Sequence, residues 1–153
     1  MRQASRAIIV KDDKILLMER NKFGLKYRAL IGGGINSGEN AIDALHREVF
    51  EEASIRIKNP KLVITEDAGE IYGIQYIFLV EYDGGEVKLS PDSEEYGISA
   101  MGKNTYNPVW FPIKDLKEAH ILPVELNDKL IEFTTNGFPS EPIQLKIDVT
   151  NII

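Results

Sequence analysis

The sequence predicts an α/β fold in which a mixed β-sheet is covered by helices on both faces. Strand-like runs lie on both sides of an amphipathic helix that begins near Asn40, and a second amphipathic helix follows Leu122-Pro123 late in the chain. Elements in this order bury their apolar faces against one another in layers. The 153 residues are enough to build such a core, and we expect a single domain over residues 1–153.

The first part of the chain is expected to form three strands. Residues 6–10 and 14–18 are rich in aliphatic side chains and are joined by the polar pair Asp12-Asp13, a pattern typical of a β-hairpin. Residues 26–31 alternate weakly and run into the triplet Gly32-Gly33-Gly34. Because glycine lets the backbone approach a ligand closely, this triplet is expected to shape a binding site.

The residues after the triplet predict an amphipathic helix. Ile42, Leu45 and Val49 recur at helical spacing and should form one buried stripe. Asn40 is the expected N-cap of this helix. Asp43 follows three residues later, where a capping box places its acidic residue.

The middle of the chain contains further strand patterns. Residues 55–65 predict a strand that is broken at Asn59-Pro60. Residues 72–82 are nearly continuous in apolar, β-branched and aromatic side chains, which indicates a central strand. Asp83-Gly84-Gly85 then predicts a turn into a hairpin partner at residues 86–89.

The last third should contain a loop, a strand, a helix and a final strand. Residues 90–107 are polar and aperiodic, which predicts a long surface loop of a kind that is often functional, and a short strand follows at 109–111. The second helix should begin near Pro123 and stop before Asn136-Gly137. Its inward-facing residues are expected to be Leu126, Leu130 and Ile131. Alternating apolar residues over 143–149 predict a last strand, at the sheet edge or in a homodimer interface.

Three acidic residues share one face of the first helix. Glu48, Glu51 and Glu52 stand at positions i, i+3 and i+4. Their carboxylates repel one another unless a cation lies between them, and such oxygen ligands suit Mg²⁺ or Mn²⁺. The alternative is a solvated face on which Arg47 and Glu51 form an ordinary surface ion pair.

A longer pattern around these acids favours the metal site. Eight residues match the Nudix signature G-x5-E-x7-R-E-U-x-E-E-x-G-U, in which U is a bulky aliphatic residue: Gly33, Glu39, Arg47, Glu48, Val49, Glu51, Glu52 and Ile55. Residues 33–55 therefore resemble the catalytic motif of the Nudix hydrolases. Ser54 departs from the pattern, because the family has a glycine there that ends the helix. A positive φ at a non-glycine residue costs about 1 kcal/mol, so the helix end is affected more than the metal site.

The resemblance implies a Nudix-type α/β/α sandwich with a mixed β-sheet and a loop–helix–loop catalytic motif. It also implies a metal-dependent enzyme that cleaves the pyrophosphate linkage of a nucleoside diphosphate derivative, with Mg²⁺ or Mn²⁺ as cofactor. Glu48, Glu51 and Glu52 would bind the metal, and Glu48 could alternatively be the base that deprotonates water.

Other motif residues would support these ligands. Arg47 would orient the neighbouring carboxylates by paired hydrogen bonds, and Glu39 would be a supporting catalytic residue that contacts Arg47. The triplet Gly32, Gly33 and Gly34 would line the nucleotide site, with a carbonyl group of Gly32 or Gly33 near the metal.

The substrate is not fixed by the motif. Tyr72 stands 17 residues after Ile55, a spacing associated in the family with dinucleoside polyphosphates, but a tyrosine in a strand is equally a packing residue. Glu70 and Ile71 replace the proline of many ADP-ribose hydrolases, and the Ser-Gln-Pro-Trp motif of NADH-specific members is absent. Elimination favours a MutT-like nucleoside triphosphate pyrophosphohydrolase. The alternatives are hydrolysis of dinucleoside polyphosphates, ADP-ribose or nucleotide sugars, and a non-catalytic nucleotide-sensing module.

Several side chains outside the motif are candidates for substrate contacts. Those that could contact phosphates, or remain solvated, are Arg20, Lys22, Lys26 and Arg28. Those that could stack on a base are Phe23, Tyr27, Tyr106 and Trp110, of which Trp110 is better explained as a core residue. His46 and His120 are expected on the surface rather than as ligands.

Composition limits the partners. A net charge of −6 argues against a general nucleic-acid-binding surface, although a bound cation would still allow a small phosphorylated substrate. No run approaches the length of a membrane span, so no membrane partner is expected. The absence of cysteine excludes disulfides and thiolate chemistry and is compatible with a cytoplasmic location.

Overall fold

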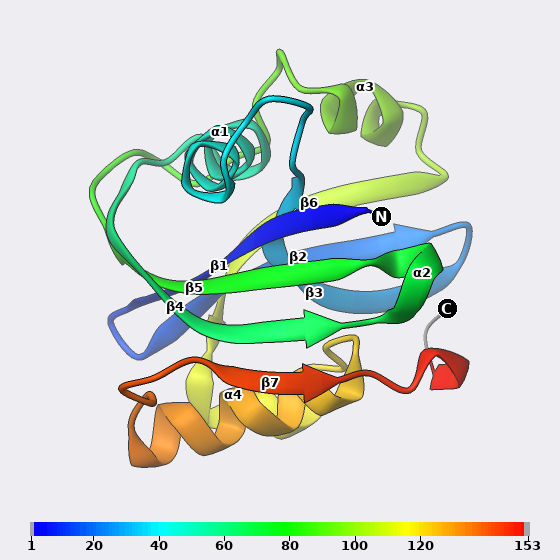
Figure 1. The fold of residues 1–153 in the computed structure, drawn as a ribbon. Helices are drawn as coiled ribbons and strands as arrows, with labels where there is room; N and C mark the ends of the chain where they lie inside the picture. Colours follow the sequence, from blue (N-terminus) through cyan, green and yellow to red (C-terminus); the bar gives the residue numbers. More distant parts are fainter. Residues whose placement is uncertain (1, 152–153) are drawn as a thin grey trace.

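One seven-stranded mixed sheet organises the computed structural model, which describes residues 2–151 (Figure 1). Its strand order is β6-β2-β3-β1-β5-β4-β7. The strands are β1 (Gln3–Lys11), β2 (Lys14–Lys22), β3 (Leu25–Gly34), β4 (Ile57–Asp67), β5 (Ile74–Tyr82), β6 (Asn104–Pro112) and β7 (Ile143–Lys146). The pairs β1–β5 and β4–β7 are parallel and the other neighbours are antiparallel, which confirms the predicted mixed sheet.

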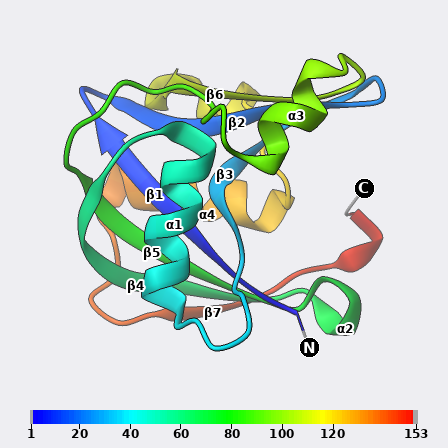
Figure 2. The same ribbon diagram turned by 90° about the horizontal axis from the view of Figure 1, so that it is seen from above.

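Helices cover both faces of this sheet. The longer helices are α1 (Ala41–Ala53) and α4 (Val124–Asn136), which lie on opposite sides in Figure 1. Figure 2 shows α1 lying across the sheet, with α3 (Glu94–Ala100) over the end that contains β2 and β6. The short elements are α2 (Gly69–Tyr72), η1 (Ile113–Glu118) and η2 (Val149–Asn151). None of the helices within residues 2–151 combines the length and apolarity that a membrane span requires.

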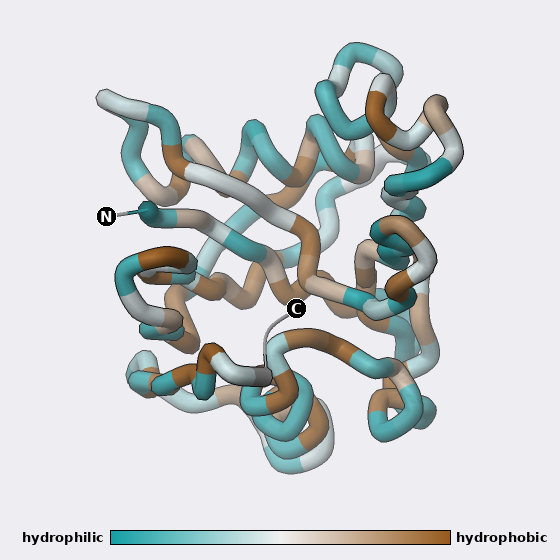
Figure 3. Tube along the Cα trace, turned by 90° about the vertical axis from the view of Figure 1, so that its right-hand side faces the viewer, coloured by the Kyte–Doolittle hydropathy of each residue, from teal (hydrophilic) through white to brown (hydrophobic). Residues whose placement is uncertain are grey.

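Each face of the sheet has its own hydrophobic core. On one face, Leu45 and Val49 of α1 pack with residues such as Ile9 of β1. On the other, Leu126 and Leu130 of α4 pack in the cluster that contains Ile8 and Ile64. Alternation along β1 therefore sends neighbouring side chains to opposite cores, as the strand period of two requires. In Figure 3 the turns of α4 carry hydrophobic and hydrophilic residues on different sides.

The ends of α1 follow the sequence prediction closely. The side chain of Asn40 accepts a hydrogen bond from the backbone N–H of Asp43 at 2.8 Å, so Asn40 is the N-cap. Ser54 is the C-cap and adopts the left-handed conformation, with φ 59° and ψ 25°. Its hydroxyl donates to the carbonyl of Lys88 at 2.7 Å, so the serine gains a hydrogen bond in the position where the family has glycine.

The buried stripe of α1 differs from the predicted one. Leu45 and Val49 are fully buried, but Ile42 lies in the first turn at the edge of the stripe and is 44% exposed. The stripe instead continues through Ala44 and Ala53 and includes two of the acidic residues. The buried residues recur at the predicted helical period of 3.6 residues, but the centre of the stripe is shifted from the predicted one.

One strand prediction in the middle of the chain is wrong, and the central strand is confirmed but starts two residues later than predicted. Residues 86–89 do not form a hairpin partner of β5, because Gly84 and Gly85 take φ values of 106° and 103° and redirect the chain. The N–H of Lys88 then bonds to Ala53 at the end of α1. Tyr72 lies in α2 rather than in the central strand, which begins at Ile74.

The last third also departs from the prediction in part. The expected loop over 90–107 contains helix α3, whose N-cap is Ser93, and β6 begins at Asn104 rather than at 109. The second helix has the expected extent, but Pro123 is its N-cap residue rather than its first helical one. Leu126 and Leu130 are buried as predicted. The final strand is shorter than predicted and lies at the sheet edge beside β4.

Candidate active site

At the end of β3, Gly33 packs closely against α1 and Gly32 packs closely against β1. A Cβ atom at Gly33 would lie 2.5 Å from Glu48 Oε2, and one at Gly32 would overlap the Ser5 carbonyl oxygen. The N–H of Gly32 donates to Glu52 Oε1 at 2.9 Å. Two of the three predicted glycines are therefore required by close contact. At Gly34 an added Cβ would meet nothing within 4 Å.

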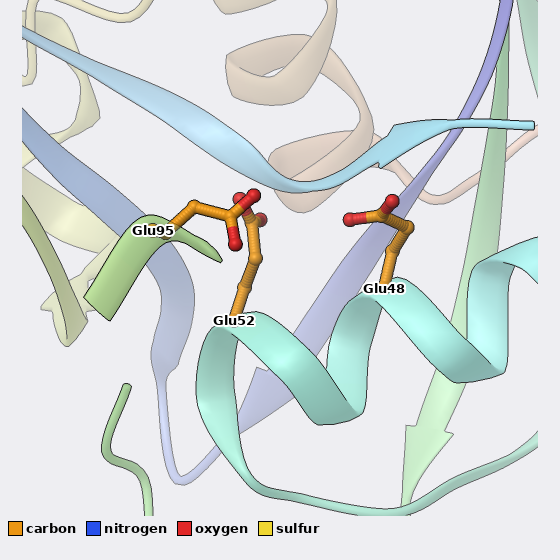
Figure 4. Close-up of side chains that lie close together, drawn as sticks. All are labelled: Glu48, Glu52 and Glu95. Atoms are coloured by element: carbon orange, nitrogen blue, oxygen red, sulfur yellow. The ribbon is translucent and has the colours of Figure 1, made fainter. Parts of the chain in front are cut away.

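Three carboxylates converge beside this glycine loop. One oxygen each from Glu48, Glu52 and Glu95 lies within 4.8 Å of the other two. Figure 4 shows Glu48 and Glu52 approaching from α1 and Glu95 from α3. Glu48 and Glu52 are 8% and 6% exposed. Glu95 Oε2 is buried without a hydrogen-bond partner.

Glu95 was missed by the sequence analysis. It lies in the segment predicted as a surface loop, and no spacing rule connects it to the motif on α1. The available signal was weak: the polar stretch contains the acidic pair Glu94-Glu95 immediately after Ser93, a residue type that often begins a helix.

Glu51 lies apart from the three converging carboxylates. Its side chain is 39% exposed and accepts a hydrogen bond from Arg47 Nη1 at 3.3 Å. The structure therefore brings together two of the three predicted acidic ligands, Glu48 and Glu52. Glu51 instead forms the ion pair with Arg47, at spacing i, i+4, that the alternative interpretation predicted.

Arg47 connects the loop before α1 to the acidic face of the helix. Its Nε and Nη2 donate to both oxygens of Glu39 at 2.8 and 2.9 Å. Nη1 donates to Glu48 Oε1 at 2.9 Å, and Nη2 also reaches the Gly34 carbonyl at 2.9 Å. These bonds hold the pKa of Glu39 down at about 2 and raise the pKa of Arg47. Both groups are therefore charged at neutral pH.

Burial dominates the electrostatics of the acidic cluster. Burial raises the pKa of Glu52 to about 8, and the hydrogen bond from Gly32 and the charge of Arg6 only partly oppose it. Burial also raises the pKa of Glu48, against the effect of Arg47. Close carboxylates with raised pKa values are stabilised as anions by a cation. The all-oxygen donor set of Glu48, Glu52 and Glu95 therefore fits a hard divalent cation such as Mg²⁺ or Mn²⁺.

The cluster opens into a cleft of about 380 Å³. Arg20, Tyr27 and Tyr106 form part of its wall, and the guanidinium of Arg20 lies 3.7 Å from the centre of the Tyr106 ring. Arg20 also donates to the hydroxyl of Tyr27 at 3.2 Å. Two of the predicted stacking residues and one predicted phosphate contact thus line the cleft.

The other candidates lie elsewhere. Trp110 packs edge-on against Tyr82 beside the α1 core, as expected for a core residue. Arg28 pairs with Glu19 at 2.9 Å. The remaining candidates are exposed and do not line this cleft: Lys22, Phe23, Lys26, His46 and His120.

Comparison with known proteins identifies the family. A family model described as the NUDIX domain matches residues 1–132, which include the glycine loop, the acidic helix and Glu95. The chain belongs to the Nudix family. This confirms the resemblance and the predicted α/β architecture.

Individual relatives are more distant. NAD-capped RNA hydrolase NudC of Escherichia coli O1:K1 is 32% identical over 83 residues, which are 54% of this chain and 32% of NudC. The chain thus spans about a third of the length of this curated relative.

Solved Nudix structures share the fold across most of the chain. The MutT Nudix hydrolase of Burkholderia pseudomallei has a TM-score of 0.62 at 24% identity, covering 86% of this chain and 95% of that one. An ADP-ribose pyrophosphatase of Streptococcus suis has a TM-score of 0.63 at 19% identity, covering 95% and 98%. At these identities the likeness shows the fold alone.

Proposed function

We propose that this Nudix protein is a metal-dependent pyrophosphohydrolase that cleaves the pyrophosphate linkage of a nucleoside diphosphate derivative. The observation that carries the proposal is the convergence of Glu48, Glu52 and Glu95 at a glycine-lined cleft. A volume of about 380 Å³ falls within the range of roughly 300–1,000 Å³ that is usual for small-molecule sites. A triphosphate is an anion, and the site would receive it through the bound cation rather than through the carboxylates.

In this proposal the three carboxylates hold the cation. When bound, a divalent cation activates water and neutralises phosphate oxygens. Glu52 is fixed by Gly32, Glu48 is fixed by Arg47, and Glu95 is supplied by α3. Glu51, expected earlier as a ligand, would act through Arg47 unless its side chain turns toward the cluster.

Glu48 has two possible roles. It can bind the metal, or it can accept the proton of the attacking water. Burial raises its pKa, which makes its carboxylate a stronger proton acceptor than an exposed glutamate. In both roles Arg47 keeps one oxygen of Glu48 in place while the other lies against Gly33. Glu39 would serve the reaction by positioning Arg47.

Our preferred substrate class is a nucleoside triphosphate, hydrolysed as by a MutT-like enzyme. The absence of the motifs for ADP-ribose and NADH supports this choice. Dinucleoside polyphosphates, ADP-ribose and nucleotide sugars remain alternatives. So does a nucleotide-sensing module without catalysis.

Four further features remain predictions. They are a single domain over residues 1–153, a homodimer, a cytoplasmic location and the absence of a nucleic-acid polymer among the substrates. Because NudC is named for NAD-capped RNA, the last of these needs a direct test.

The experiment is a product-release screen with Mg²⁺, with Mn²⁺ and with EDTA. The panel contains canonical and oxidised nucleoside triphosphates, diadenosine polyphosphates, ADP-ribose, NADH, nucleotide sugars and NAD-capped RNA. We expect release of pyrophosphate and a nucleoside monophosphate from a triphosphate, lost with EDTA and in Glu52→Gln. Glu132→Gln, an exposed substitution on α4, is the matched control and should keep wild-type turnover.

Each outcome is informative. Turnover of another panel member, and not of a triphosphate, would identify that compound as the substrate class instead. Full activity in a folded Glu52→Gln protein would contradict the assignment of the site. Nucleotide binding without turnover of any panel member would favour the sensing module.

A further inference from the structure

A further buried acid lies in the same cleft, apart from the acidic cluster of Glu48, Glu52 and Glu95. Glu66 on β4 is 3% exposed and lines the cleft, and its Oε2 has no hydrogen-bond partner. Burial raises its pKa to about 7. A buried carboxyl group without a partner is unfavourable, and native structures rarely keep one without a reason. A ligand that donates hydrogen bonds to Glu66 would supply the missing partner.

Neighbouring polar groups are already satisfied by the protein. Glu66 and Gln75 are paired residues on β4 and β5, so their side chains lie side by side on one face of the sheet. Gln75 Oε1 accepts from Arg6 Nε at 2.9 Å, and Gln75 Nε2 donates to the Tyr72 carbonyl at 3.2 Å. Arg6 also donates to the carbonyl of Leu30 at 3.2 Å. Glu66 is therefore the acceptor in this group that a ligand can use.

The geometry connects Glu66 to the reaction centre. Arg6 Nη1 donates to the Gly32 carbonyl at 3.3 Å, and the N–H of the same glycine donates to Glu52. A line of hydrogen bonds thus runs from Glu52 through Gly32 and Arg6 to Gln75. Gln75 lies beside Glu66. A ligand with its phosphates at Glu52 and another polar group at Glu66 would lie along this line within one cleft.

The surroundings of Glu66 suit a flat ring with a polar edge. The residues that line the cleft after β4 and around the start of α4 are apolar or aromatic: Ala68, Tyr72, Leu122, Pro123 and Leu126. Apolar walls with a small number of polar groups are the usual composition of a heterocycle site. A nucleobase places its apolar faces against such walls and its hydrogen-bonding edge against the polar group.

We propose that Glu66 accepts hydrogen bonds from the edge of the substrate's nucleobase and selects guanine, an inference that rests on the proposed function in taking the ligand to be a nucleotide. A carboxylate offers two adjacent acceptors and no donor. Guanine presents two adjacent donors, N1–H and the 2-amino group. Adenine, cytosine and uracil each place an acceptor beside the donor on that edge, which a carboxylate repels.

The first test compares ligands on the wild-type protein. GMP, IMP and AMP are titrated calorimetrically with Mg²⁺ at pH 8, where Glu66 is ionised, and a monophosphate has no pyrophosphate linkage that could be hydrolysed. IMP differs from GMP only by the missing 2-amino group. We expect GMP to bind at least about tenfold more tightly than IMP and AMP, as for a lost bidentate base contact. Equal affinity for the three would overturn the inference without any variant having to fold.

The second test changes the acid. Glu66→Gln replaces one acceptor with a donor at nearly constant shape and should bring GMP binding down to the level of IMP. Glu125→Gln is the matched control, because its carboxylate acts on Glu66 through charge but does not line the cleft. It should keep the preference for GMP. A preference for GMP that survives in a folded Glu66→Gln protein would also overturn the inference.

These binding tests separate the two proposals. Selective GMP binding without turnover of any member of the panel would remove the proposed hydrolysis and keep the role of Glu66. Metal-dependent hydrolysis of a pyrophosphate substrate without any preference for guanine would keep the proposed function and remove the inference.

Discussion

Arg47 and Glu39 form a two-point ion pair, with Nε–Oε2 at 2.8 Å and Nη2–Oε1 at 2.9 Å. The pair joins the loop before α1 to the middle of that helix. Because the same guanidinium holds Glu48 at 2.9 Å, the position of Glu48 depends on the pair. The planar arrangement of donors in arginine makes these contacts simultaneously, and a lysine ammonium cannot reproduce them.

Arg47→Lys should therefore lower kcat while the protein stays folded. A catalytic group displaced by about 1 Å can lose on the order of a hundredfold in rate, and we expect a loss of that order here. The measurement is steady-state kinetics on the substrate found in the screen, with circular dichroism for the fold. Lys129→Ala, which breaks an exposed ion pair on α4, should leave kcat unchanged. A similar kcat in Arg47→Lys and wild type would show that the paired hydrogen bonds of the guanidinium are not needed for catalysis.

Gly33 and Gly34 provide a matched pair for testing the close contact at the cluster. An added Cβ would meet Glu48 at Gly33 and nothing within 4 Å at Gly34. Neither glycine has a positive φ, so the two alanine variants differ mainly in this contact. We expect Gly33→Ala to lose at least tenfold in kcat and Gly34→Ala to lose far less. Equal losses in the two variants would attribute the effect to loop stiffness instead.

The local part of the site was predictable from the sequence, and the distant part was not. The cap at Asn40, the acids on α1 and the contact between Arg47 and the helix depend on spacing within one short segment. Glu95 reaches the cluster only because α3 folds over the end of the sheet, and Glu66 lies beside Gln75 in the cleft because β4 pairs with β5. No pattern within a short stretch of sequence predicts either of these tertiary placements.

The wrong hairpin prediction and the misplaced start of the central strand have a common physical cause. Composition alone extended the central strand to Tyr72 and made residues 86–89 a hairpin partner. Gly73, Gly84 and Gly85 adopt positive φ in the structure and change the chain direction at those points. Which glycines do so depends on tertiary contacts, such as that of Lys88 with the end of α1.

Ser54 should contribute to stability through its hydroxyl group rather than through its backbone. Ser54→Ala keeps the strained φ and loses the bond to Lys88, so it should destabilise the protein by about 1 kcal/mol. Ser54→Gly loses the same bond but relieves a strain of about 1 kcal/mol, so its stability should stay near that of wild type. Urea denaturation measures both. A more stable Ser54→Ala would contradict this account, and turnover should be unaffected in both variants.

Glu66 makes stability depend on pH in a defined direction. Its pKa is about 7 in the folded protein against 4.5 for an ordinary glutamate. Below pH 4.5 the group is protonated in both states and has no unfavourable effect. Between pH 4.5 and pH 7 the unfolded chain has lost the proton and the folded protein keeps it, so stability falls across this window, by about 3 kcal/mol in total, and stays constant above it. Glu66→Gln cannot ionise and should escape this loss.

The free energy of unfolding of Glu66→Gln should therefore exceed that of wild type by more at pH 8 than at pH 5. The shifts at Glu48 and Glu52 are present in both proteins and cancel in the difference. Urea denaturation in EDTA at the two pH values measures this difference in the free energy of unfolding. Because Glu125 faces Glu66 and raises its pKa, Glu125→Gln should reduce the loss only in part. Parallel pH profiles for wild type and Glu66→Gln would mean that Glu66 ionises in the folded protein as it does in water.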